Sequence, residues 1–258
     1  MKRKNLTTAS FPIGPEHRMV RSSEDFALLP FDNGVLYNNV FAKGKIQNAF
    51  QQVFLDGNQF GWEWDWPENT GPSVKTYPEV ILGRSPWSKA EYGCQLPCAL
   101  EKVGYVLDFD FTTEAEGSWC ESFDFWITNK PDPEVKDITS NLCIWTRTHQ
   151  LEGDYRGSRE TVKIGTRTYA AIVETPADQP AKTWKTLFIV DTEPRSRGSL
   201  ELQPFMEILT ERGLAKPDHF LATAELGNEV AYGKGRTIVQ KFSLRYSTKD
   251  NRVLIYDS

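Results

Sequence analysis

Short runs of alternating apolar and polar residues, separated by turn-forming residues, recur along the chain. Turn residues lie at 32–34, 56–58, 67–72 and 130–133. The alternating or apolar runs lie at 105–111, 122–127, 141–146, 185–190, 236–246 and 253–256. Because successive side chains of a strand point to opposite faces, this pattern predicts many short β-strands joined by turns. Such an arrangement is typical of a β-sandwich, a jelly roll or a barrel.

Residues 199–212 differ from this pattern, because their apolar residues recur at helical spacing: Leu202, Phe205, Met206 and Leu209. Pro204 fits the first turn of a helix, and Gly213 is a signal for its C-terminus. We therefore expect a helix over 202–212 that packs its apolar side on the outside of a sheet.

Three tryptophans occupy every second position just before a turn rich in Pro, Gly and Asn. We call Trp62, Trp64 and Trp66 the tryptophan stripe. In a strand their indoles share one face, and the acidic residues between them share the other. Large aromatic residues at such positions fill the core of a sandwich. They can also line a cleft in which flat rings stack on the apolar CH faces of sugars. The stripe by itself favours the core and leaves both interpretations open.

The length of 258 residues suits one large all-β domain, and no Gly/Ser linker, repeat or low-complexity segment divides it. We therefore expect an N-terminal arm over 1–30 and a single domain over 31–258. The apolar share of 39% is normal for a globular protein. A formal net charge of −5 argues against a nucleic-acid partner or an anionic membrane, which both favour a basic surface.

No apolar run approaches the roughly 18 residues that a membrane-spanning helix needs. Residues 1–10 are not followed by the apolar core of a signal peptide, so the sequence assigns no cellular location. We expect no membrane partner and a monomeric protein.

Metal and cofactor signatures are missing from the sequence. The three histidines have no spacing that suggests a ligand cluster, so we expect no metal site. Four cysteines are too few for a disulfide scaffold in this length, and Cys94 and Cys98 could pair or remain thiols. No Walker loop, Rossmann fingerprint, Gly-x-Ser-x-Gly elbow or His-Glu-x-x-His motif occurs, so we expect no cofactor. Carboxylate chemistry remains, and a glycosidase needs two carboxyl groups flanking the scissile bond.

The chain carries, in order, YNNVFAKG (37–44), GWEWDWPE (61–68), VKTYPE (74–79), SFDFWITNKPDP (122–133), NLCIWT (141–146), the predicted helix and ELGNEVAYGKG (225–235). This collinear series resembles glycoside hydrolase family 12, the compact jelly-roll endoglucanases and xyloglucanases. The resemblance covers about residues 38–242. It implies an all-β, concanavalin-like jelly roll of two antiparallel sheets with one helix on the convex side. It also implies a cleft that binds β-1,4-linked glucose units.

The resemblance gives several residues a sugar-binding role. At least one tryptophan of the stripe would face sugar, together with Trp145. Asn39 lies in a segment similar to the family's Asn-Asn-x-Trp-Gly. Phe41 stands where the family usually has a stacking tryptophan, so that subsite is altered.

Glu229 is the proton donor that the resemblance implies. Its segment, residues 227–235, is similar to the family's Gly-Thr-Glu-Pro-Phe-Thr-Gly-Ser-Gly, in which the glutamate is the acid/base. A donor of this kind works near neutral pH only if burial or a neighbouring negative charge raises its pKa. The alternative for Glu229 is a surface glutamate beside a hairpin turn.

The nucleophile segment departs from the family pattern. Aligned without a gap on the family's Tyr-Glu-Leu-Met-Ile-Trp-Leu, the chain places Asn141 where the nucleophilic glutamate belongs. An amide cannot form the glycosyl-enzyme ester of a retaining glycosidase. Glu152, or the neighbouring Asp154, is the candidate for a displaced carboxylate that holds a water, as an inverting reaction requires. A solvated loop residue is the alternative for Glu152.

Three hypotheses for function follow. The first is an endo-acting hydrolase of a β-glucan-type polysaccharide with an altered mechanism. The second is a non-catalytic glycan-binding protein that kept the cleft, and the third is an enzyme whose nucleophile was changed to trap a substrate. In each case the expected partner is a polysaccharide or oligosaccharide. Proteins of the family are commonly secreted.

Overall fold

The computed structural model describes residues 19–31, 34–57, 59–68, 73–87, 91–92, 96–101, 104–151, 159–174 and 183–247. The predicted strand at 253–256 lies outside them. The strands, in chain order, are β1 (Val20–Ser22), β2 (Leu28–Phe31), β3 (Gly34–Tyr37), β4 (Phe50–Asp56), β5 (Gln59–Trp66), β6 (Glu79–Arg84), β7 (Glu91–Tyr92), β8 (Cys98–Ala99), β9 (Gly104–Ala115), β10 (Ser118–Thr128), β11 (Ile138–His149), β12 (Glu160–Ile164), β13 (Arg167–Glu174), β14 (Lys185–Asp191), β15 (Arg197–Glu201) and β16 (Phe220–Ser247). The helix α1 spans Gln203–Glu211, and a short 3-10 turn, η2, spans Val135–Asp137.

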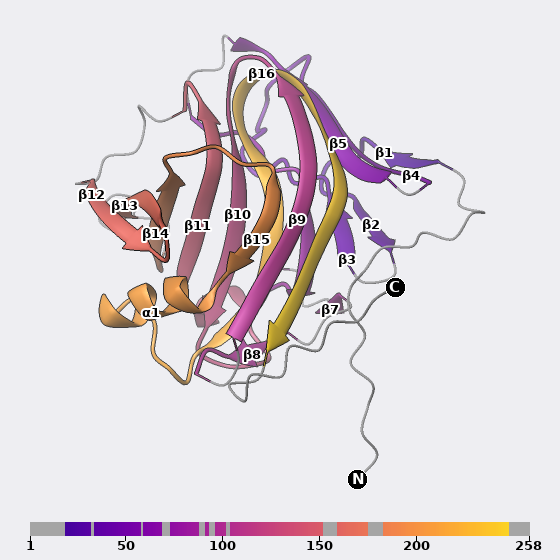
Figure 1. Ribbon diagram of the computed structural model, residues 1–258. Helices are drawn as coiled ribbons and strands as arrows, with labels where there is room; N and C mark the ends of the chain where they lie inside the picture. Colours follow the sequence, from indigo (N-terminus) through magenta and orange to yellow (C-terminus); the bar gives the residue numbers. More distant parts are fainter. Residues whose placement is uncertain are drawn as a thin grey trace.

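The strands form two sheets that share the long strand β16 (Figure 1). The A sheet has the order β1-β4-β5-β16-β9-β15, and residues 233–247 of β16 belong to it. The B sheet has the order β2-β3-β6-β16-β10-β11-β14-β13-β12, with β7 beside β6 and β8 beside β16. The predicted jelly-roll sandwich is confirmed. One pair, β11 with β14, is parallel, which the sequence did not predict.

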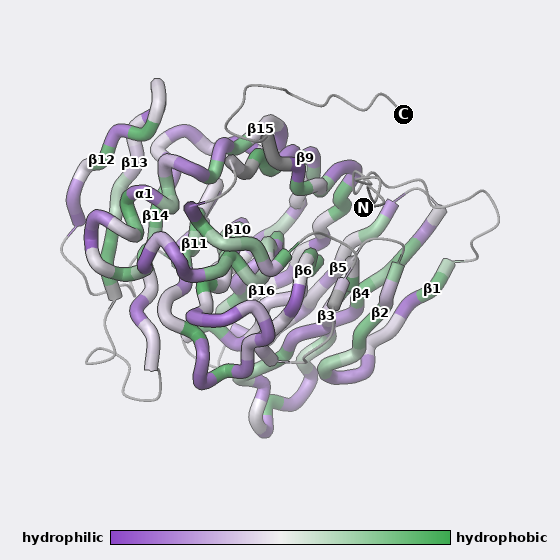
Figure 2. Tube along the Cα trace, turned by 90° about the horizontal axis from the view of Figure 1, so that it is seen from below, coloured by the Kyte–Doolittle hydropathy of each residue, from purple (hydrophilic) through white to green (hydrophobic). Residues whose placement is uncertain are grey.

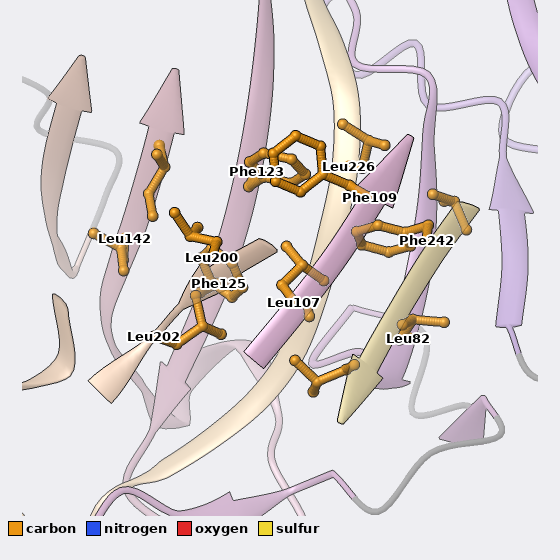
Figure 3. Close-up of a cluster of buried hydrophobic side chains, with 14 of the residues drawn as sticks. Leu82, Leu107, Phe109, Phe123, Phe125, Leu142, Leu200, Leu202, Leu226 and Phe242 are labelled. Atoms are coloured by element: carbon orange, nitrogen blue, oxygen red, sulfur yellow. The ribbon is translucent and has the colours of Figure 1, made fainter. Parts of the chain in front are cut away.

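Aromatic side chains fill the space between the two sheets. The ring of Phe123 in β10 lies 4.9 Å from that of Phe109 in β9 and 6.4 Å from that of Phe242 in β16, measured between centroids. Figure 3 shows these rings meeting from facing strands, and Figure 2 shows β9 and β15 lying across from β10 and β11. Full burial of each such side chain stabilises the fold by about 1.5–3 kcal/mol.

The tryptophan stripe belongs to this core. Its three indoles are at most 2% exposed and point from β5 into the space between the sheets. Trp62 donates from Nε1 to Oδ1 of Asn228 at 2.7 Å. A Cβ on Gly235 would lie 2.3 Å from Cζ2 of Trp64, so only glycine lets β16 pass beside that ring. The hypothesis that the stripe stacks on sugar is therefore wrong, because β5 needs an apolar face against the B sheet.

The helix α1 lies where the sequence predicted it, with Pro204 in its first turn. Its buried residues are Phe205, Met206 and Leu209. The ring of Phe205 meets that of Tyr169 in β13 edge to face, 5.6 Å apart. The helix thus continues the layer of the A sheet beyond β15 and covers the convex side of the B sheet (Figure 1).

The N-terminal boundary differs from the expected one. Residues 20–22 pair with β4 and residues 28–31 pair with β3, so the sheets begin before residue 31. Within the described ranges, no helix has the length and apolar character needed to cross a membrane.

The core role of the stripe predicts a large loss of stability on truncation. We expect Trp62→Ala to lower the free energy of unfolding by about 3–5 kcal/mol, because it leaves a cavity and removes one of the two donors to Oδ1 of Asn228. Phe50→Ala, at a side chain that is 43% exposed on β4, is the matched control and should stay within about 0.5 kcal/mol. Urea unfolding of both variants measures this. Equal losses would contradict the core assignment.

Candidate active site

Polar residues of three neighbouring strands gather on the face of the B sheet that points away from the A sheet. In β10, Ser122 and Asp124 alternate with the core residues of the same strand. Asp124 pairs with Cys143 of β11 on one side and with Glu225 of β16 on the other. Cys143, Asp124 and Glu225 therefore lie at one level across three strands. We call Glu79, Glu225 and Asp124 the carboxylate row; each is at most 7% exposed.

Glu79, at the start of β6, is hydrogen-bonded to Glu225 of the adjacent β16. Its Oε1 accepts from Nδ2 of Asn39 at 3.1 Å. Its Oε2 is buried and has no hydrogen-bond partner among the residues that the structure describes. Two neighbouring buried carboxylates repel each other when both are ionised, so this arrangement favours a proton on the pair.

The electrostatics of the carboxylate row favour protonation. Burial, followed by the charge of Glu225, raises the pKa of Glu79 well above its ordinary value. Burial also raises the pKa of Glu225 to about 7, and Asp124 adds to that rise. Burial, followed by the charges of the row, also raises the pKa values of the neighbouring Tyr37, Tyr77 and Cys143. A row of this kind can present one protonated and one ionised carboxyl near neutral pH.

Hydroxyl and thiol groups hold Asp124 in place. Its Oδ1 accepts from Oγ of Ser122 at 2.7 Å and from Sγ of Cys143 at 2.8 Å. Tyr77 lies across the face and donates from its hydroxyl to the carbonyl oxygen of Ser122 at 3.1 Å. A Cβ on Gly227 would lie 2.6 Å from the Tyr77 ring, so this glycine makes the room that Tyr77 needs.

Glu229 lies on the same face as Glu225, further along β16. It pairs with Cys120 of β10, whose Sγ lies 3.5 Å from its Oε2. Its side chain is partly exposed. Its charge reaches Cys143, because it contributes with Asp124 to the raised pKa of that thiol after burial. The proton-donor role of Glu229 stays a prediction.

Asn141 and Glu229 lie at opposite ends of the carboxylate row. Asn141 is level with Trp126 of β10, which is level with Thr223 of β16. The extended strand from Thr223 to Glu229 is about 20 Å long. Asn141 is buried, and its Nδ2 donates to the carbonyl oxygen of Phe125 at 3.5 Å. The structure therefore does not set Asn141 opposite Glu229, and Cys143 is the β11 residue that contacts a carboxylate of the row.

The other predicted site residues divide into three groups. Asn39 contacts the row through Glu79, and Phe41 is 56% exposed near the start of β6. Trp145 is on the predicted face but only 1% exposed, because Phe188 and Leu151 pack around it, so its expected open indole face is not observed. Glu152 and Asp154 lie outside the described residues.

Sequence reasoning missed the carboxylate row, although each residue lies in a segment that it singled out. The available signal was the alternation along the strands. Glu225 and Glu229 are four residues apart in β16, and Ser122 and Asp124 are two apart in β10, so each pair shares a face. What could not be read was which strands are neighbours. In the part of the chain that the structure describes, no group of three His, Cys, Asp or Glu side chains is arranged to hold a metal ion.

The raised pKa values predict a pH-dependent stability. Between the ordinary pKa of 4.5 and the raised value of about 7, the folded protein binds more protons at Glu225 than the unfolded chain. Stability should therefore fall as the pH rises through this range. Glu79→Gln supplies a permanent N–H donor to Glu225, so we expect a smaller fall and a higher thermal midpoint than wild type at about pH 8.

Thermal unfolding from about pH 5 to pH 8 measures this effect, with the exposed Glu207→Gln on α1 as the control. The control should follow the wild-type slope. Identical slopes for wild type and Glu79→Gln would show that the pair holds no proton.

Comparison with known proteins gives a clear result for structure and none for sequence. No protein-family model matches the chain. No curated protein matches it either. A family 12 xyloglucanase from Bacillus licheniformis, in complex with ligand, is similar in structure with a TM-score of 0.79 and 22% identity, over 88% of this chain and 100% of that one.

Two endoglucanases are also similar. A metagenome-derived family 12 endoglucanase has a TM-score of 0.75 and 18% identity, over 91% of this chain and 100% of that one. Endoglucanase Cel12A from Rhodothermus marinus has a TM-score of 0.74 and 19% identity, over 89% and 99%. The resemblance found in the sequence is thus confirmed at the level of the fold: the chain has the β-sandwich jelly roll of the family 12 glycoside hydrolases.

Proposed function

We propose that the protein acts on a β-glucan-type polysaccharide as an endo-acting glycoside hydrolase with an altered mechanism. The observation that carries this proposal is the carboxylate row. Three buried carboxyl groups share one face of the B sheet, and burial raises the pKa values of two of them, Glu79 and Glu225. Such a row lowers the stability of the fold, because each buried charge costs desolvation free energy. We therefore explain it by function and not by stability. The structural neighbours, which are xyloglucanases and endoglucanases, support the choice of polysaccharide.

Hydrolysis of a glycosidic bond needs one carboxyl that donates a proton and one carboxylate that attacks or activates water. In the proposal Glu229 donates the proton to the leaving oxygen. The ionised carboxylate belongs to an element other than β11, because β11 has no acidic residue. A carboxylate that activates water, as in an inverting reaction, fits this arrangement. Glu152 and Asp154 remain candidates for that base, and Asp124 joins them because it lies on the floor of the site.

Non-catalytic glycan binding is the second candidate function. The observation that favours it is the composition of β11, whose residues on this face are Asn141, Cys143 and Trp145. The resemblance to family 12 places the nucleophilic carboxylate of a retaining enzyme on this strand, which has no acidic residue. The two candidates share a binding face and differ in whether a glycosidic bond is cleaved.

Glu229→Gln tests the hydrolase proposal. Removing the proton donor should lower the rate of hydrolysis of a β-1,4-glucan or xyloglucan by about 100- to 10,000-fold, while binding is retained. Release of reducing ends measures the rate, and calorimetry measures binding. Glu207→Gln should leave both unchanged. Glycan binding by the wild type without any hydrolysis would instead favour the non-catalytic function.

Asn141→Glu tests the position of the missing nucleophile. A retaining pair needs carboxyl groups about 5–5.5 Å apart, whereas about 20 Å of strand separates the levels of Asn141 and Glu229. We therefore expect this variant to show no more retaining activity than the size-matched Asn141→Gln. The anomeric form of the first product, followed by proton NMR, measures it. If Asn141→Glu gave a product with retained anomeric configuration and Asn141→Gln did not, residue 141 would reach the scissile bond.

A further inference from the structure

Three tryptophans that are far apart in sequence meet beside the carboxylate row. Trp87 follows β6, Trp126 lies in β10 and Trp184 precedes β14. Their ring centroids are 5.5–5.7 Å apart, and their planes meet at 74–86°. We call these three residues the indole cluster. Edge-to-face packing of this kind fixes the orientation of each ring.

The indole cluster is joined to the carboxylate row by a hydrogen bond. Nε1 of Trp126 donates to Oε2 of Glu225 at 3.1 Å. Glu225 also interacts with Glu79, so the orientation of the Trp126 ring affects both carboxyl groups. The cluster is therefore continuous with the candidate active site.

One ring of the cluster is open to solvent. Trp87 is 49% exposed, whereas Trp184 is 9% exposed. The buried Nε1 of Trp184 has no hydrogen-bond partner within the described part of the chain. The tryptophan stripe shows that this fold can bury a tryptophan completely. The exposure of Trp87 is therefore not explained by a general inability of the fold to bury indoles. An exposed indole held rigidly by two others offers a large contact area at a low cost in conformational entropy.

The position of Trp87 suits an extended ligand. Phe41 lies near Asn39 and the start of β6, and Trp87 follows the end of that strand. The strand from Glu79 to Arg84 is about 17 Å long, so the exposed aromatic residues stand at its two ends with the carboxylate row between them.

We propose that Trp87 and Trp126 form a sugar subsite in which a pyranose ring of a neutral β-glucan stacks on the indole of Trp87 and a sugar hydroxyl binds Glu225. This subsite rests on the proposed function and specifies its ligand. Neutral sugars fit, because the carboxyl groups of Glu79, Asp124 and Glu225 would repel the carboxylate of a uronic acid.

Calorimetric titration of the full chain with cellohexaose tests the subsite. We expect Trp87→Ala to weaken binding about 3- to 10-fold and Trp87→Phe to weaken it less, because a flat ring remains. Trp126→Phe should also weaken binding, because it removes the donor that orients Glu225. Phe50→Ala, which removes a similarly exposed ring on the A sheet, should bind as the wild type does. A hexamer of galacturonic acid should bind more weakly than cellohexaose.

The outcomes separate this subsite from the proposed function. No binding of any β-glucan by the wild type would overturn the proposed function. Wild-type binding that Trp87→Ala leaves unchanged would overturn the subsite and leave the proposed function standing. Equal binding of the galacturonic acid hexamer would overturn the preference for neutral sugars.

Discussion

Every central strand of the B sheet has to present an apolar face to the A sheet, and this constraint decides what its other face can carry. Phe123 meets the rings of β9 and β16 and Phe125 lies in the same core, so Asp124 between them must point the other way. A slip of one residue would place Asp124 in the core and a phenylalanine at the candidate active site. The core thus holds the register of the site, and Gly227 and Gly235 let the strands approach closely enough to keep it.

Burial of neighbouring carboxyl groups gives the carboxylate row its chemical character. A lone buried carboxylate normally finds a cation, as Glu121 does with Arg147 on the core side of β10. Glu79 and Glu225 instead have one another, and a proton is the least costly way to keep both buried. The same property that weakens the fold at high pH is the one that acid–base chemistry on a sugar requires. This is a common relation between stability and function at active sites.

Similarity of fold does not decide which reaction, if any, takes place. The neighbours in structure are a xyloglucanase and an endoglucanase, yet β11 of this chain has no acidic residue. The side chains present instead, a buried thiol bound to Asp124 and a buried amide bound to the backbone, cannot carry a glycosyl group as an ester. Any hydrolysis therefore has to use carboxylates of other elements.

Local pattern by itself determined the fold class, the strands at 62–66, 105–111, 122–127, 141–146, 185–190 and 236–246, and the helix with Pro204 in its first turn, because strand and helix periods are written in neighbouring residues. It did not mark other strands, such as β1, β12 and β15. The same pattern favoured the core for the tryptophan stripe, and the structure agrees. It could not place Asn141 relative to Glu229, because their levels depend on the pairing of β10 with both β11 and β16. Nor could it bring Glu79 to Glu225 or Trp87 to Trp126 and Trp184. Those contacts join residues far apart in the chain, and only the order and register of strands in the folded sheets set which of them meet.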